Sequence, residues 1–339
     1  MAQGILPREQ RRGPPGGASQ PAAMCMGGLD WDDLAEKEAA AKHGGQLPKA
    51  SELPPLKVLS WCMRALPPGG KVPAEGEDAA RHERLCEAIA ASGAHVVCLQ
   101  GYEGLEAQWL VQLYAQRLHE LGFDVDSMAH LPHSPDGVAV LWRRDSVRVS
   151  LRGEMRAHGA PNERAALLLV LRDARASEYG PRLAVVCTQL GPVPGQEPGR
   201  GRGQQLREVL EAMTSNLAHI AGVPVLFCAN LGGPLDDELD SRMQDFGFLH
   251  VWQMVHKRPC RVTHTDESGN SCAADHVWLR GRFDPEAVAL LPESVPDDEK
   301  LCRPAAGAAA GASASSPEYW GELSDHRPML GTFRWPEGS

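Results

Sequence analysis

The chain has 339 residues, of which 34 are basic and 44 acidic, and its formal net charge is −10. This acidic balance argues against a broad basic surface for binding nucleic acid, although it is compatible with an enzyme that has a small local basic site. No apolar run approaches the roughly 18 residues that a membrane span requires, so we expect no membrane partner.

Residues 1–54 have the composition of a disordered tail. The stretch 11–23 is rich in Pro, Gly, Ser and Ala and has no apolar period, so it cannot bury enough surface to order itself. One segment in this tail, residues 29–42, combines an aspartate that can cap a helix with a run of Ala, Glu and Lys. We expect a short helix there, and a docking helix for a partner is the alternative.

From residue 55 to residue 335 the pattern is that of a folded domain in which helices alternate with buried strands. Amphipathic segments at 78–92, 106–122 and 204–222 predict helices, and a Gly/Pro-rich loop is expected at 191–203. Continuous apolar runs predict strands at 56–63, 94–100, 136–144, 163–173, 182–190, 223–231 and 273–279, with a last strand inside 323–335. Such strands are covered on both faces, which favours a layered α/β fold with mixed sheets. The Ala/Gly/Ser-rich stretch 303–316 is expected to be a disordered insertion.

The nine cysteines are scattered and never form a C-x-x-C pair. Several lie inside predicted strands, where a reduced thiol behaves as a small apolar group. We therefore expect a reducing compartment, the cytoplasm or the nucleus, and an intracellular protein. Three arginines near the start, Arg8, Arg11 and Arg12, leave an organellar address as an alternative.

The sharpest chemical motif is Ser324-Asp325-His326, which leads into the last predicted strand. An aspartate beside a histidine can orient the imidazole and stabilise its protonated form, as acid–base or phosphate-binding work requires. If this motif is considered by itself, the alternative interpretation is a surface Asp–His pair that has no catalytic or binding role.

The order of the segments at the strand ends resembles the endonuclease/exonuclease/phosphatase superfamily, and within it the deadenylases of the carbon-catabolite-repressor-4 and nocturnin type. The likeness extends from Leu56 to Trp335 and is carried by Leu59–Cys62, Cys98–Gly101, Asp136–Ala139, Thr188-Gln189, Cys228–Leu231, Asp275–Trp278 and Ser324–His326. It implies a four-layer αββα sandwich with two packed mixed β-sheets and outer helices. It also implies a site at the rim where strand ends of both sheets meet, and Mg²⁺-dependent cleavage of a phosphate ester by an activated water.

Several positions depart from the pattern that this resemblance implies. The metal-binding Glu of the family's Leu-Gln-Glu motif corresponds to Gly101, and the His of its Thr-His pair to Gln189. The water-handling Asp of Gly-Asp-Phe-Asn corresponds to Ala229 in the direct pairing. A pairing shifted by one residue would instead place the amide of Asn230 there, but no carboxylate.

Three residues match the family's remaining motifs and are our candidates for catalytic remnants: Asp275, Asp325 and His326. We expect Asn230, Gln189 and Arg164 to be available for substrate binding. Glu103, two residues beyond the lost glutamate, is the candidate replacement for the metal ligand.

We therefore predict a catalytically decayed pseudo-nuclease that acts as a binding or scaffold protein with a protein partner and no cofactor. The alternatives are an active, diverged phosphodiesterase or exoribonuclease that uses Mg²⁺, and a module that binds a nucleotide or RNA without cleaving it. The loss of each charge-stabilising or acid–base group costs about 10²–10⁴ in rate, which favours the decayed enzyme. Whether the chain is an enzyme stays open at this point.

Overall fold

The computed structural model describes residues 49–63, 79–102, 108–130, 137–157, 164–176, 180–191, 198–220, 222–260, 262–265, 270–299, 320 and 323–335. Our predictions for residues 1–48, including the helix at 29–42, for Glu103 and for the insertion at 303–316 lie outside these ranges. Within them, Leu53 packs into the core ahead of the first strand, so the folded part includes residues that we assigned to the tail.

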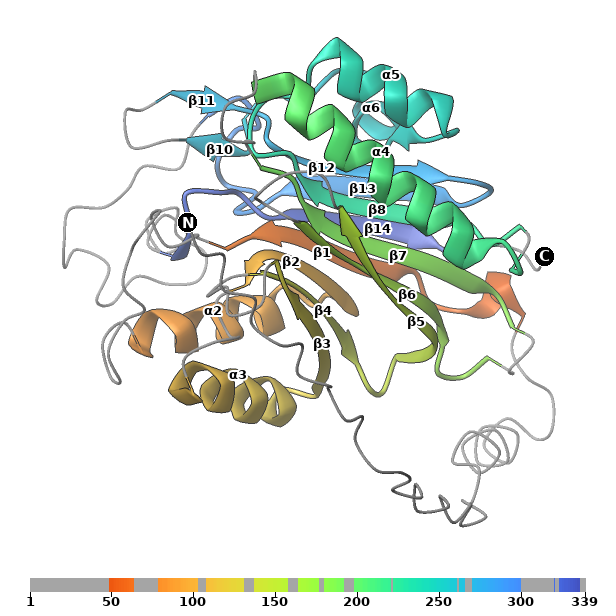
Figure 1. Cartoon of the computed structure of the whole chain (residues 1–339). Coiled ribbons are helices and arrows are strands. Elements are labelled where there is room, and N and C mark those ends of the chain that lie inside the picture. The colour runs from red at the N-terminus through yellow and green to blue at the C-terminus, as the bar shows by residue number, and fades with distance from the viewer. Residues whose placement is uncertain are drawn as a thin grey trace, which may run out of the picture.

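Two six-stranded sheets pack face to face, as Figure 1 shows. The first contains, in spatial order, β13 (Asp284–Leu290), β14 (Met329–Arg334), β1 (Leu56–Cys62), β2 (Val96–Tyr102), β4 (Gly137–Arg143) and β3 (Phe123–Ala129). The second contains β5 (Val147–Ala157), β6 (Arg164–Asp173), β7 (Arg182–Gln189), β8 (Val225–Asn230), β12 (Asp275–Arg280) and β9 (Leu249–His250). The β1–β2 and β7–β8 pairs are parallel and the other pairs antiparallel, so both sheets are mixed, as predicted.

Helices cover the outer faces of this sandwich (Figure 1). Side chains of α2 (Ala79–Ala91) and α3 (Gln108–Glu120) pack on the first sheet, and those of α4 (Pro198–Leu217) and α5 (Asp237–Asp245) pack on the second. These layers give the predicted four-layer αββα architecture. The short elements are η1 (Ala50–Glu52), α6 (Val251–His256), β10 (His264–Thr265) and β11 (Ser271–Cys272). None of the described helices is both long and apolar enough to cross a bilayer.

The strands carry apolar side chains on both faces because both faces are covered. In β7, Val185 and Cys187 point into the core between the sheets, whereas Ala184 and Val186 point outward against α4. This alternation is the period of two that a strand imposes, and it decides which residue of each strand can reach a site between the sheets.

The structure corrects two of the element predictions. α4 begins at Pro198, inside the stretch 191–203 that we expected to be a loop; proline is well suited to a first helical turn, where its missing N–H costs nothing. The strands β3, β5 and β13 were not predicted. Each is an edge strand of its sheet and carries polar or only partly buried side chains, so it lacks the continuous apolar run of a buried strand.

Candidate functional site

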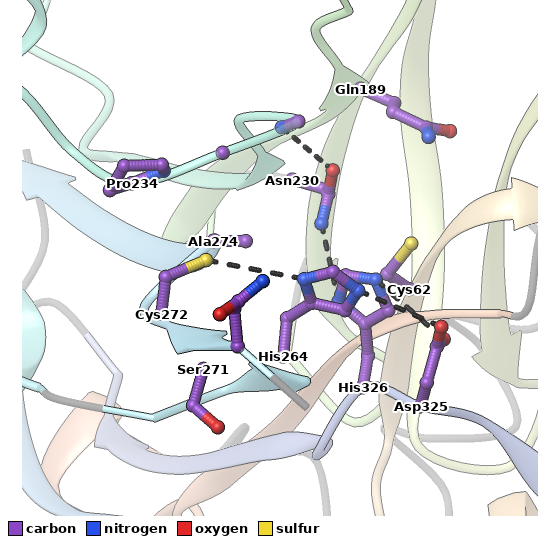
Figure 2. A pocket seen from close by; sticks show the side chains of 13 residues that line it. Cys62, Gln189, Asn230, Pro234, His264, Ser271, Cys272, Ala274, Asp325 and His326 are labelled. Carbon is purple, nitrogen blue, oxygen red and sulfur yellow. Dashed lines mark hydrogen bonds and ion pairs between the residues drawn. The ribbon is translucent and has the colours of Figure 1, made fainter. Parts of the chain in front are cut away.

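A cavity of about 520 Å³ opens at the end of the sandwich where strand ends from both sheets meet. Cys62 at the end of β1, Gln189 at the end of β7 and Asn230 at the end of β8 contribute to its wall, and the β10–β11 hairpin and the segment before β14 close it (Figure 2). It is lined by Cys62, Gln189, Asn230, Gly232, Gly233, Pro234, His264, Asn270, Ser271, Cys272, Ala274, Asp325 and His326. We call this cavity the cleft.

A buried Asp–His pair supports the inner wall of the cleft. Nδ1 of His326 lies 2.6 Å from Oδ2 of Asp275, and the amide of Asn230 donates to the other carboxylate oxygen of Asp275 over 2.7 Å. Desolvation opposes both charges, but each group stabilises the other: the imidazolium lowers the pKa of Asp275, and the carboxylate raises the pKa of His326. Because Nδ1 contacts Asp275, Nε2 is the nitrogen of His326 that can contact a ligand in the cleft.

A second cluster forms where β10 pairs through its backbone with the segment that precedes β14. His264 and His326 form an isolated antiparallel bridge, and their rings stack with centroids 4.1 Å apart. Nε2 of His264 lies 3.6 Å from Oδ2 of Asp325, and Nε2 of His326 lies 3.9 Å from Oδ1 of the same carboxylate. Cys272 Sγ lies 4.0 Å from Nδ1 of His264.

Electrostatics in this cluster favour charged groups. Burial works against protonation of His264, but Asp325, together with Cys272, raises its pKa to about 9. Desolvation likewise opposes ionisation of Asp325, but the two histidines lower its pKa to about 2. The outer part of the cleft is thus a carboxylate held between two imidazoles, and His264 and Cys272 are site residues that sequence reasoning missed. The only sequence signal for them was a histidine in the polar stretch 261–266.

The structure corrects the direct pairing of the β8 motif. Ala229 packs in the outer core of the second sheet. Asn230 instead faces the cleft, where its side-chain Oδ1 accepts a hydrogen bond from the backbone N–H of Gly232. Because adjacent residues of a strand point to opposite faces, a water-handling group has to sit at Asn230 and not at Ala229. The pairing shifted by one residue is the one that fits, and it places an amide where the motif has a carboxylate.

Gly101 lies at an irregularity of β2, where its pairing with β4 shifts. Its φ angle is +60°, which L-residues with a side chain rarely adopt. A glutamate at this position would therefore be strained in the backbone conformation that Gly101 adopts.

Of the two further residues predicted to bind substrate, Gln189 lines the cleft and Arg164 does not. The side-chain oxygen of Gln189 accepts from Nε2 of His130 over 3.2 Å, because Nδ1 of that ring accepts the N–H of Ala165. The guanidinium of Arg164 lies against Gly191, two residues beyond Gln189.

The donors of the cleft do not suit Mg²⁺, the ion that the resemblance implies. Mg²⁺ demands octahedral oxygen ligands. Among the lining residues that the structure describes, Asp325 supplies the only carboxylate. The carboxylate of Asp275 is fully buried and already accepts from His326 and Asn230. The remaining strong donors near Asp325 are two imidazoles.

No protein-family model and no curated protein sequence matches the chain. Solved structures do match its fold. The human nocturnin catalytic domain with bound sulfate superposes with a TM-score of 0.58 at 17% identity and covers 83% of this chain and 94% of its own. A mannosyl-6-phosphatase from Bacteroides thetaiotaomicron gives 0.57 at 12% identity and covers 82% and 99%. D. rerio TDP2 in complex with a single-strand DNA product gives 0.55 at 20% identity and covers 82% and 98%. The chain has the endonuclease/exonuclease/phosphatase fold.

Proposed function

We propose that the chain is a pseudo-nuclease: it keeps the endonuclease/exonuclease/phosphatase fold and its cleft, but it binds a ligand or partner there without hydrolysing a phosphate ester. The observation that carries this proposal is the amide of Asn230, hydrogen-bonded to Asp275, at the cleft-facing position where the family motif has its water-handling aspartate.

The proposal gains support from the absence of a set of oxygen ligands for Mg²⁺ among the described residues that line the cleft. Gly101 offers no side chain, and Asp325 is alone as a carboxylate in the described wall of the cleft. A hydrolase of this fold needs both a cation to stabilise the transition state and a base to activate or align water. Loss of either group costs about 10²–10⁴ in rate, so loss of both leaves negligible turnover.

One observation favours an active, diverged Mg²⁺-dependent phosphodiesterase as a second candidate. The Asp275–His326 pair is intact and buried, and a histidine held this way can contact a phosphate or transfer a proton. This candidate needs a further carboxylate, for which Glu103 is the sequence candidate. The third alternative is a module that binds a nucleotide or RNA without cleaving it, and the net charge of −10 disfavours it.

Turnover assays on the purified full chain test the proposal. The substrates are oligo(A), a dinucleotide and a sugar phosphate monoester, each with Mg²⁺ or Mn²⁺, and the background is set by the Asp325→Asn variant. We expect the wild-type protein to match that variant. Metal-dependent turnover that disappears in Asp325→Asn would refute the pseudo-nuclease, and its loss in Glu103→Gln as well would assign the missing ligand to Glu103.

A further inference from the structure

We infer that the cleft is a binding site for a zinc-class transition-metal ion, with His264, Asp325 and His326 as its ligands. The inference deepens the proposed function and rests on it, because it names the ligand of a cleft that has lost its magnesium chemistry. It differs from the family's site in the nature of the donors: imidazoles dominate where oxygen atoms would be needed for Mg²⁺.

The three side chains already converge on one point. One ligand atom from each of them lies within 4.8 Å of one from each of the others, and both Nε2 atoms face the two oxygens of Asp325, at 3.6 and 3.9 Å. Figure 2 shows the two imidazole edges directed at this carboxylate from one side. Ligand atoms of a tetrahedral zinc site are about 3.3 Å apart, given Zn–N and Zn–O distances near 2.0–2.1 Å, so small side-chain rotations complete the site.

His326 has the hydrogen-bond partner that a metal-ligating histidine usually has. A ligating histidine usually donates its second N–H to a carboxylate, which fixes the ring and makes the free nitrogen more basic. Asp275 accepts from Nδ1 of His326 at 2.6 Å. Its own position is fixed by the Asn230 amide and by its backbone N–H, which donates to Thr263.

Backbone pairing orders the other ligands. The bridge between His264 and His326 and the N–H of Thr265, which donates to the carbonyl of Asp325 over 3.2 Å, hold β10 against the segment before β14. The three ligands therefore come from two chain segments that a backbone ladder keeps in register, and they need no large movement to meet.

The donor set selects the class of metal. Imidazole suits Zn²⁺, Cu²⁺, Ni²⁺ and Fe²⁺, whereas Mg²⁺ and Ca²⁺ take oxygen ligands. Three protein ligands leave a fourth position toward the cavity for water or an anionic group, as in open zinc sites. In a second group, Cys62, Asp275 and His326, one ligand atom of each residue also lies within 4.8 Å of the others. A nearby thiol further favours zinc over magnesium.

Metal titration of the tag-free, metal-stripped full chain tests the inference. Calorimetry with Zn²⁺ and visible absorption with Co²⁺ as a spectroscopic probe are expected to give one site per chain. His264→Gln and Asp325→Asn are expected to weaken it at least 10-fold, the lower end of what loss of an outer-shell partner costs. The controls are His119→Gln, at an exposed position on α3, and Cys260→Ser, both expected to bind as the wild-type protein does.

Thermal unfolding without metal, measured for every variant, shows that the substituted chains are folded. Zinc binding that is absent, or that keeps its wild-type strength in both His264→Gln and Asp325→Asn, would overturn the inference. A parallel Mg²⁺ titration separates the two claims: specific Mg²⁺ binding at Asp325 would refute the proposed function, whereas failure to bind either ion would refute the zinc site alone.

Discussion

The contact between His326 and Asp275, with Nδ1 and Oδ2 2.6 Å apart, joins the two sheets at the cleft. Asp275 begins β12 in the second sheet, and His326 lies in the segment that leads into β14 of the first sheet. Both side chains are buried, so the pair contributes to the stability of the sandwich as well as to the chemistry of the site.

Asp275→Asn is expected to lower the free energy of unfolding by about 3 kcal/mol, because removing one partner of a buried ion pair leaves the other uncompensated. Denaturant unfolding at neutral pH measures this change. The matched control is Asp297→Asn, which removes the partially exposed partner of Arg258 and should cost less than about 1 kcal/mol. Equal losses in the two variants would show that the buried pair has no special role.

Arg327 is buried and fixes the loop that follows β13. One of its terminal nitrogens donates to the carbonyls of Pro296 and Glu299 at 2.7 and 3.0 Å, and the other donates to that of Val295 at 2.8 Å. A lysine ammonium cannot reproduce this planar fork.

Arg327→Lys is therefore expected to cost about 3 kcal/mol of unfolding free energy, since hydrogen bonds from a charged donor contribute about 1.5–3 kcal/mol each. Arg334→Lys, at an exposed position paired with Glu286, is the control and should change stability by less than about 1 kcal/mol. Indistinguishable unfolding curves for the two variants would contradict the anchoring role of Arg327.

Gly101→Ala tests the backbone conformation at the position where the family has its metal ligand. With φ at +60°, a Cβ is expected to cost about 1–2 kcal/mol. The same substitution at Gly203, inside α4, meets only the flexible end of Glu238 and is expected to be neutral or to stabilise by up to about 1 kcal/mol. Chemical denaturation of both variants checks the opposite signs, and a tolerated alanine at position 101 would contradict the strain.

Stability is expected to fall on acidification, in part because of His82. Burial, together with the positive charge of Arg81, lowers the pKa of His82 from 6.5 to about 4, and its Nδ1 lies 2.7 Å from the hydroxyl of Tyr114. The unfolded chain binds the extra proton first, so the contribution of His82 is complete above pH 6.5 and is lost as pH falls toward 4.

The pH dependence of unfolding for the wild-type chain and for His82→Gln measures this contribution. Between pH 6.5 and 4 the wild-type protein should lose up to about 3 kcal/mol more than the variant. His119→Gln, which changes an exposed histidine, should keep the wild-type slope. Parallel curves for wild type and His82→Gln would show that folding leaves the pKa of His82 unchanged, which would contradict the effect of burial.

Sequence reasoning was most informative where burial is complete. The apolar runs of β1, β7 and β8 predicted central strands because both of their faces are covered. β5 and β13 escaped prediction because an edge strand exposes half of its side chains and looks like a solvated segment.

The residues of the site likewise fall into those that a local sequence motif predicted and those that only the three-dimensional structure brings together. Asp275 and His326 came from local motifs, and the structure brings them together. The face to which Asn230 points depends on strand register, which the sequence does not display. His264 joins the cleft only through its bridge to His326, a pairing between segments distant in the chain that no local pattern encodes.

Calorimetric titration of the full chain with Mg²⁺ decides whether the cleft has lost the ion that a hydrolase of this fold needs. We expect no specific heat of binding, because Asp325 is the only carboxylate in the described wall of the cleft and Mg²⁺ requires several oxygen ligands. A one-site isotherm that disappears in Asp325→Asn would contradict it, since the cleft would then still hold the ion of an active hydrolase.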